Sequence, residues 1–98
     1  MSTLRERIEL AIKKRDEDTK KWARDNLEKF ANQAEEKILK SVNDYESPKV
    51  YLNIFESNNS FTRKRTEELI KLFKEELGIY AEISDLFRKD VNILVDLD

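Results

Sequence analysis

The sequence predicts an α+β fold in which a long N-terminal helix precedes a β-α-β-β unit. Residues 3–43 contain neither Gly nor Pro and are rich in Glu, Lys, Arg, Ala and Leu, which are strong helix formers. Three short segments further along carry β-branched and aromatic residues, which favour strands. A chain of 98 residues has room for one hydrophobic core. We therefore expect a single domain over 1–98, built from a helix over 3–43 and a βαββ unit over 50–98.

The first helix is predicted to begin at Thr3 and to end before Pro48. Thr3 and Glu6 have the spacing of a capping box, in which each side chain hydrogen-bonds the other's backbone N–H. A proline disfavours helical geometry in the residue before it, so the helix should not continue through Ser47. Acid-before-base pairs four residues apart are expected to support the exposed surface: Glu9–Lys13, Asp16–Lys20, Glu17–Lys21, Asp25–Lys29 and Glu36–Lys40.

Apolar side chains divide this helix into two unequal halves. The second half keeps one apolar face, through Ala23, Leu27, Phe30, Ala34, Ile38, Val42 and Tyr45. The first half has only the stub Leu4, Ile8, Ala11 and Ile12. A continuous helix would be about 60 Å long, whereas a compact domain of this size is about 33 Å across. No Gly or Pro favours a break near Asp16–Thr19, so we expect one helix with residues 3–20 projecting; a break there is the alternative.

The rest of the chain is predicted to form a strand over 50–55, a helix ending at Leu77, and strands over 79–84 and 91–97. Ser60 or Thr62 is expected to cap the helix, and Gly78 to stop it in a left-handed conformation. The short link between the last two strands predicts a hairpin; Leu86 and Phe87, near its tip, are either core or an exposed contact. The helix between strands one and two is expected to make a crossover connection, so these two strands are predicted to be parallel. The expected order of the strands in the sheet is 1-3-2.

One face of the sheet is predicted to pack under the second helix, whose buried side would be Thr66, Leu69, Ile70, Phe73 and Leu77. This face carries Val50, Leu52, Ile54, Ala81, Ile83, Val91, Ile93 and Val95. The opposite face groups Tyr51, Phe55, Tyr80 and Leu94. Large exposed apolar patches are uncommon, so we expect the first helix to cover it and give three layers; a partner-binding face is the alternative.

The composition excludes several kinds of chemistry. The chain has no His and no Cys, so the usual base at neutral pH, a thiolate nucleophile and the common zinc ligands are missing. Its single Gly cannot form a phosphate-binding loop. We therefore expect no catalytic residue, metal site or cofactor. The remaining enzymatic hypothesis is a divalent-metal-dependent hydrolase using Glu56, Asp85 and Asp90 near the strand ends, where Asp is also a common turn residue.

The sequence also indicates a cytoplasmic protein without a membrane partner. The start of the chain is not followed by the apolar region of a signal peptide. No apolar run approaches the roughly 18–20 residues of a transmembrane helix. The absence of Cys excludes a disulfide-stabilised secreted domain.

Two basic clusters suggest nucleic-acid binding as an alternative function. Arg63, Lys64 and Arg65 lie at the predicted start of the second helix, where the helix dipole disfavours cations; a bound phosphate or carboxylate would offset that cost. A second band comprises Lys13, Lys14, Arg15, Lys20, Lys21 and Arg24. Three acidic residues interrupt this band and the net charge is −2, which favours a solvated charged helix over a nucleic-acid surface.

These observations favour a non-enzymatic protein-binding factor, such as an inhibitor, adaptor or regulator. Its expected contact residues are Leu4, Ile8 and Ile12 on the first helix, or Tyr51, Phe55 and Tyr80 on the sheet. The run Arg63-Lys64-Arg65 is the expected anion-binding site. Self-association into a homodimer through the long helix is a further expectation, while no motif identifies any other protein partner.

Overall fold

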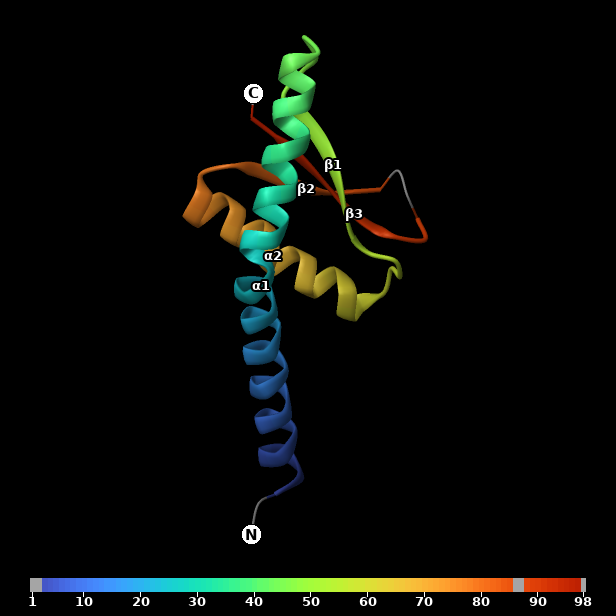
Figure 1. Ribbon diagram of the computed structural model, residues 1–98. Helices are drawn as coiled ribbons and strands as arrows, with labels where there is room; N and C mark the ends of the chain where they lie inside the picture. The colour runs from blue at the N-terminus through green and yellow to red at the C-terminus, as the bar shows by residue number, and fades with distance from the viewer. Residues whose placement is uncertain (1–2, 86–87, 98) are drawn as a thin grey trace.

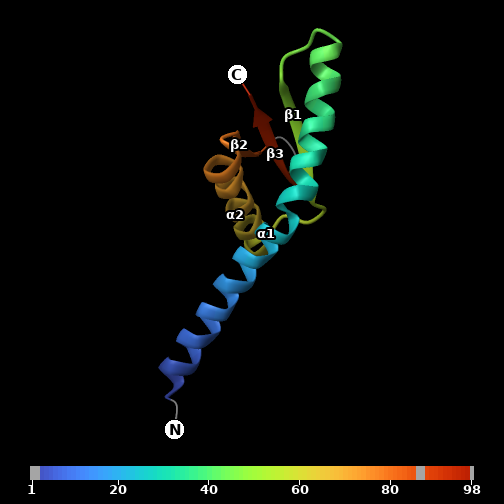
Figure 2. The same cartoon turned by 60° about the vertical axis from the view of Figure 1, so that its left-hand side comes forward.

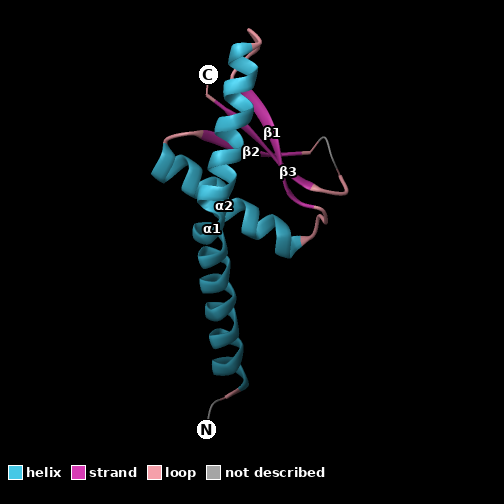
Figure 3. Ribbon diagram, in the orientation of Figure 1, coloured by secondary structure: helices cyan, strands magenta, loops and turns pink. Residues whose placement is uncertain are grey.

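The computed structural model describes residues 3–85 and 88–97, which form two helices and a three-stranded sheet. The elements are α1 (Leu4–Asn43), β1 (Lys49–Phe55), α2 (Ser60–Leu77), β2 (Tyr80–Ser84) and β3 (Val91–Asp96). Strand β3 lies between β1 and β2 and is antiparallel to both (Figures 1 and 3). The predicted α+β class and the strand order 1-3-2 are therefore confirmed. Leu86 and Phe87 lie outside the described residues.

Helix α1 is one uninterrupted helix of 40 residues. Its predicted capping box is formed: the Thr3 hydroxyl accepts from the Glu6 N–H at 3.1 Å, and the Glu6 carboxylate accepts from the Thr3 N–H at 3.3 Å. The buried face consists of Ala23, Phe30, Ala34 and Ile38. It ends earlier than predicted, because Val42 is about half exposed and Tyr45 lies beyond the helix with a φ of 60° and its side chain fully exposed.

Both helices pack on the same face of the sheet, so the prediction of three layers is wrong and the fold has two (Figure 2). Val50, Val95 and Ala81 are paired across the three strands and are all buried. They share one core with the buried residues of both helices. Helix α1 lies over β1, and α2 lies over β2 and β3. The three-stranded sheet is only about 10 Å wide between its outer strands, which is about the distance between the axes of two helices in contact, so two helices are enough to cover one face.

The N-cap of helix α2 lies one residue before the earlier of the two predicted caps. Asn59 is the N-cap: its side chain accepts from the Thr62 N–H at 3.0 Å, and the Thr62 hydroxyl accepts from the Asn59 N–H at 3.0 Å. The helix ends as predicted at Gly78, which has a φ of 64°. The buried residues are Thr62, Thr66, Leu69, Leu72 and Phe73. The predicted Leu77 is instead 40 % exposed, because α2 also packs against α1 and its buried side is turned toward that helix.

A β-bulge changes which face of the sheet Phe55 occupies. The pairing between β1 and β3 shifts between Asn53 and Phe55, which places Ile54 and Phe55 on the same side of the strand. Phe55 is half-buried among the helices and its ring stacks on that of Trp22, with centroids 5.0 Å apart. Phe55 therefore does not share the face of Tyr51 and Tyr80, contrary to the prediction.

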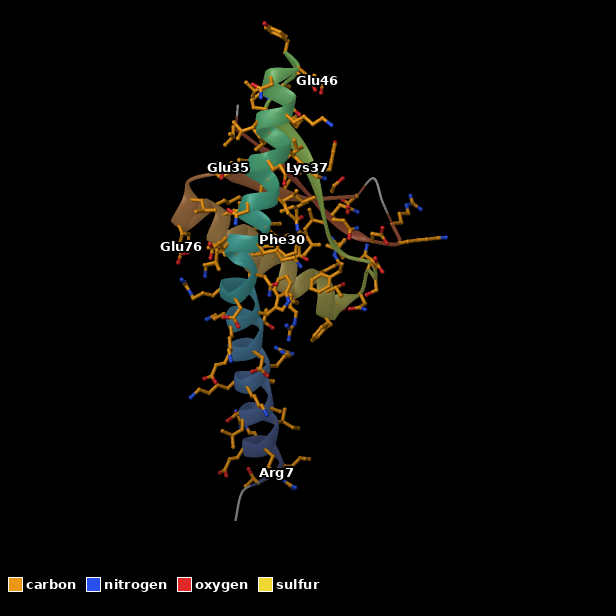
Figure 4. The ribbon with its side chains drawn as sticks, viewed as in Figure 1. Arg7, Phe30, Glu35, Lys37, Glu46 and Glu76 are labelled. Atoms are coloured by element: carbon orange, nitrogen blue, oxygen red, sulfur yellow. The ribbon has the colours of Figure 1, made fainter. Side chains whose placement is uncertain are left out.

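The N-terminal half of α1 extends away from the rest of the fold, and we call residues 4–21 the arm. Every residue from 3 to 18 is exposed, and the structure measures 64 × 28 × 18 Å. In Figure 4 the labelled Arg7 lies near the far end of the arm, with no other element beside it. Of the predicted acid-before-base pairs, none forms an ion pair between described residues; the arm instead has Arg5–Glu9 at 3.1 Å.

Candidate functional site

The arm carries the most exposed group of apolar side chains on either helix. Leu4, Ile8, Leu10 and Ile12 are between 43 and 67 % exposed. Leu4, Ile8 and Ile12 follow one another at four-residue steps and therefore lie along one side of the helix, with Ala11 beside them. Leu10 points elsewhere and was not among the predicted contact residues. No described residue outside the arm covers this apolar side.

The charged residues that follow form two blocks of opposite sign. Lys13, Lys14 and Arg15 are succeeded directly by Asp16, Glu17 and Asp18. Arg15 pairs with its neighbour Asp16 at 3.1 Å. The other four make no ion pair with any described residue and are exposed. The predicted basic band is thus split by an equally charged acidic block, and both blocks are presented to solvent.

A groove opens where the arm meets α2. It has a volume of about 750 Å³ and is lined on the α1 side by residues that include Thr19 and Lys20. On the α2 side it is lined by Phe61, which is 60 % exposed, and by lysines and glutamates of the exposed face. One sign of this feature is present in the sequence, because Phe61 is an apolar residue outside the buried side of its helix. The groove therefore joins the arm to an exposed aromatic side chain of α2.

The three residues of the Arg63-Lys64-Arg65 run point to different partners and do not converge on one site. Because α2 begins at Ser60, Arg63 ends its first turn, and Lys64 and Arg65 lie in its second. Arg63 approaches Asp85 at 3.9 Å, and Lys64 pairs with Glu67 at 3.5 Å. This placement weakens the opposition to the helix dipole from which an anion site was predicted, because two of the three cations lie beyond the first turn.

Arg65 belongs to the contact between the two helices. Its guanidinium lies 4.4 Å from the ring centroid of Phe61 and 5.9 Å from that of Trp22. Its Nε atom is buried and has no hydrogen-bond partner among the described residues. A guanidinium stacked on two aromatic rings is stabilised by cation–π attraction. Arg65 thus packs between the two helices, against Trp22 of α1 and Phe61 of α2.

The sheet face turned away from the helices is open. Tyr51 and Tyr80 on it are 40 and 48 % exposed, and Leu94 lies half-buried in the central strand between β1 and β2. A shallow hollow of about 420 Å³ lies beside Tyr51, Glu82 and Leu94. An uncovered face is what the partner-binding alternative requires; Phe55, which was predicted to belong to it, lies on the other face.

Tyr80 is held by a short hydrogen bond on this open face. Its hydroxyl donates to a Glu82 carboxylate oxygen at 2.6 Å. This bond raises the pKa of Tyr80 above its ordinary value of 10.0, with smaller effects in the same direction from burial and from the negative charges of Glu82 and Asp96. The phenol is therefore preferentially neutral in the folded state.

We expect the phenolate titration to show this shift. A raised pKa means that the Tyr80–Glu82 bond stabilises the fold below the ordinary tyrosine pKa and is lost as the pH rises through the folded value. The near-ultraviolet absorbance of wild type should therefore include a phenol that ionises above pH 10.0. Tyr80→Phe should remove that component and Glu82→Gln should move it downward. Superimposable titrations of wild type and Glu82→Gln would contradict the assignment.

The three carboxylates of the hydrolase hypothesis are not gathered into a metal site. Asp85 approaches Arg63 at 3.9 Å. Asp90 accepts a hydrogen bond from the Asn53 side chain at 3.4 Å, and Glu56 is exposed in the loop after β1. Across residues 3–85 and 88–97, no three His, Cys, Asp or Glu side chains are grouped so that they could hold a metal ion.

The comparisons with known proteins add no relative to this description. Searches of protein-family models, of curated proteins and of solved structures found no match to this chain. Neither α1 nor α2 contains, within the described residues, an apolar stretch of the length needed to span a membrane.

Proposed function

We propose that this chain is a non-enzymatic protein-binding factor, such as an inhibitor, adaptor or regulator, and that the arm is its binding element. The observation that supports this proposal is the uncovered apolar side of the arm. Leu4, Ile8 and Ile12 are each more than 40 % exposed on a helix that extends beyond the rest of the fold. Regular spacing on a rigid helix is the usual form of a helix that docks into an apolar groove.

Folding does not require apolar side chains at these positions. An isolated helix of this length is marginally stable in water because nucleation is costly, but the arm continues a helix that is already packed from Ala23 onward. Arg, Lys, Gln and Glu have helix propensities close to that of Leu. Exposed Leu and Ile therefore add nothing to the fold, whereas burial against a partner would contribute about 1.5–3 kcal/mol for each fully covered side chain.

Nucleic-acid binding is the second candidate, supported by one arrangement. Arg15 and Lys20 of α1 face Lys64 and Lys71 of α2 across the groove. Four cations from two helices form a basic track that neither helix provides alone. Asp16, Glu67 and Glu68 line the same groove, which weakens its attraction for phosphate. This function predicts affinity that falls steeply with salt.

Affinity capture from a lysate of the native host separates the two candidates. Immobilised wild type is compared with Ile8→Asp, and with Leu39→Asp as the matched control, because Leu39 lies on the same helix at 54 % exposure but outside the arm. We expect a defined set of proteins on wild type and Leu39→Asp, absent from Ile8→Asp, and retained after nuclease treatment. Equal capture by all three would contradict the arm as the binding element. Capture that disappears with nuclease would support nucleic acid instead.

A further inference from the structure

We infer that the partner that fits the arm is a second copy of this chain, bound antiparallel about a twofold axis between Arg15 and Asp16. This inference rests on the proposed function of the arm as a protein-binding element and names its occupant. It is carried by the charge order of the arm, by the position of the groove, and by the apolar side that no described residue covers.

The charge blocks are complementary to themselves in one orientation only. An axis between Arg15 and Asp16 sets Lys13 level with the second copy's Asp18, and Lys14 level with its Glu17. Arg15 then faces Asp16 of the second copy. Successive residues of a helix point in directions about 100° apart, so the complementarity is between whole blocks, with each basic block lying beside an acidic one. Parallel helices in register would set each block against its own sign, and like charges at such spacing are repulsive. The same surface on both copies makes a closed, isologous contact.

The same register places the apolar stub at the groove. Ile12 of one copy lies at the level of Thr19 of the other, and Ile8 at the level of Ala23. Thr19 lines the groove, and exposed Phe61 lies on its opposite wall. The apolar side of one arm thus meets the groove of the other copy, and the twofold axis repeats the contact. The helices overlap from residue 4 to residue 27, about 36 Å.

The charge blocks are also available for this contact. Lys13, Lys14, Glu17 and Asp18 are exposed and make no ion pair within the described part of the chain. A foreign helix would need a basic block and an acidic block in the reverse order, together with an apolar side in register. The arm itself meets all of these requirements. Exposed ion pairs contribute little individually, so we assign the affinity to the apolar contact and the orientation to the charges.

Two charge-block variants test the pairing. In the all-acidic variant the basic block is replaced, through Lys13→Glu, Lys14→Glu and Arg15→Glu. In the all-basic variant the acidic block is replaced, through Asp16→Lys, Glu17→Lys and Asp18→Lys. Sedimentation should show wild type as a dimer that weakens with salt, and each variant alone as a monomer. Mixing the two variants should restore a dimer that contains one of each. This recovery cannot come from a misfolded chain, and circular dichroism should show similar helix content in all samples.

A chemical cross-link tests the direction. The chain has no cysteine, so one introduced thiol is unique. With a short bis-maleimide, Arg15→Cys should cross-link to itself across the axis, because Arg15 lies on the same side of the helix as Leu4, Ile8 and Ile12. Arg5→Cys should not, because its two copies would lie about 30 Å apart along antiparallel helices. Efficient cross-linking at both positions would indicate parallel helices and overturn the inference.

The remaining outcomes separate this inference from the proposed function. Ile8→Asp should give a monomer, whereas Leu39→Asp should remain a dimer. A wild type that is monomeric at all concentrations, with lysate proteins still captured through Ile8, would overturn the second copy as occupant and leave the protein-binding function standing. Two variants that stay monomeric when mixed, while wild type dimerises, would equally overturn the charge pairing.

Discussion

Replacing Phe73 with alanine is expected to lower the free energy of unfolding by about 3–5 kcal/mol. Phe73 has no exposed surface and belongs to the core shared by both helices and the sheet. A domain of this size is stable by only about 5–15 kcal/mol, and no residue of the arm is buried to add to it. Urea unfolding measures the loss directly, and the melting temperature should fall by about 15 °C or more.

Phe61→Ala is the matched control for this substitution. Both residues are phenylalanines of α2, but Phe61 is 60 % exposed and touches chiefly the guanidinium of Arg65. Its removal should cost about 1 kcal/mol or less. Both variants should be measured at the same low protein concentration, because self-association would add to the apparent stability. Equal losses from the two variants would show that the core is not centred where we place it.

The order and type of the elements could be predicted because their signals are local. The absence of Gly and Pro from residues 3–43 predicts a continuous helix, and the helix is continuous. The capping box at Thr3 and the left-handed stop at Gly78 depend on residues within one turn of each other. The strand order follows from chain connectivity and a short hairpin link. Each of these inferences needs no knowledge of distant contacts.

The layer arrangement could not be predicted because it depends on how the elements pack. An apolar side on α1 shows that the helix packs on something, but not on which face of the sheet. The bulge after Asn53 has no Gly or Pro to indicate it, yet it moves Phe55 from the open face to the ring of Trp22. The position of Phe55 then helps to fix α1 on the same face as α2.

The exposure of the arm could be predicted from local signals, whereas the contacts between the two helices could not. Leu4, Ile8 and Ile12 could be identified because a projecting helix needs no tertiary contact to present them. Arg65 was predicted as an anion ligand, whereas its partners are the rings of Phe61 and Trp22, the second of which lies far away in the sequence. The groove also depends on two helices meeting. Only the exposed position of Phe61 gave any sign of it in the sequence.

The two helices meet closely at Ala23 of α1. Ala23 has no exposed surface, and its two neighbours both contact α2: Trp22 lies against Arg65, and Arg24 donates to Glu76 at 2.6 Å. A small side chain at this position lets the helix axes approach closely. We expect Ala23→Leu to lower the free energy of unfolding by about 1–3 kcal/mol through overpacking.

The control is Ala31→Leu, because Ala31 lies on the same helix but is only half-buried at the edge of the core. Ala and Leu have similar helix propensities, so neither substitution should change the helix itself, and the added volume at Ala31 can extend toward solvent. Urea unfolding should show a clearly smaller loss for Ala31→Leu than for Ala23→Leu. The wider helix crossing in Ala23→Leu should also change the fluorescence of Trp22, which is the chain's single tryptophan. A stability and a spectrum unchanged by Ala23→Leu would mean that α1 and α2 are not in close contact at this residue.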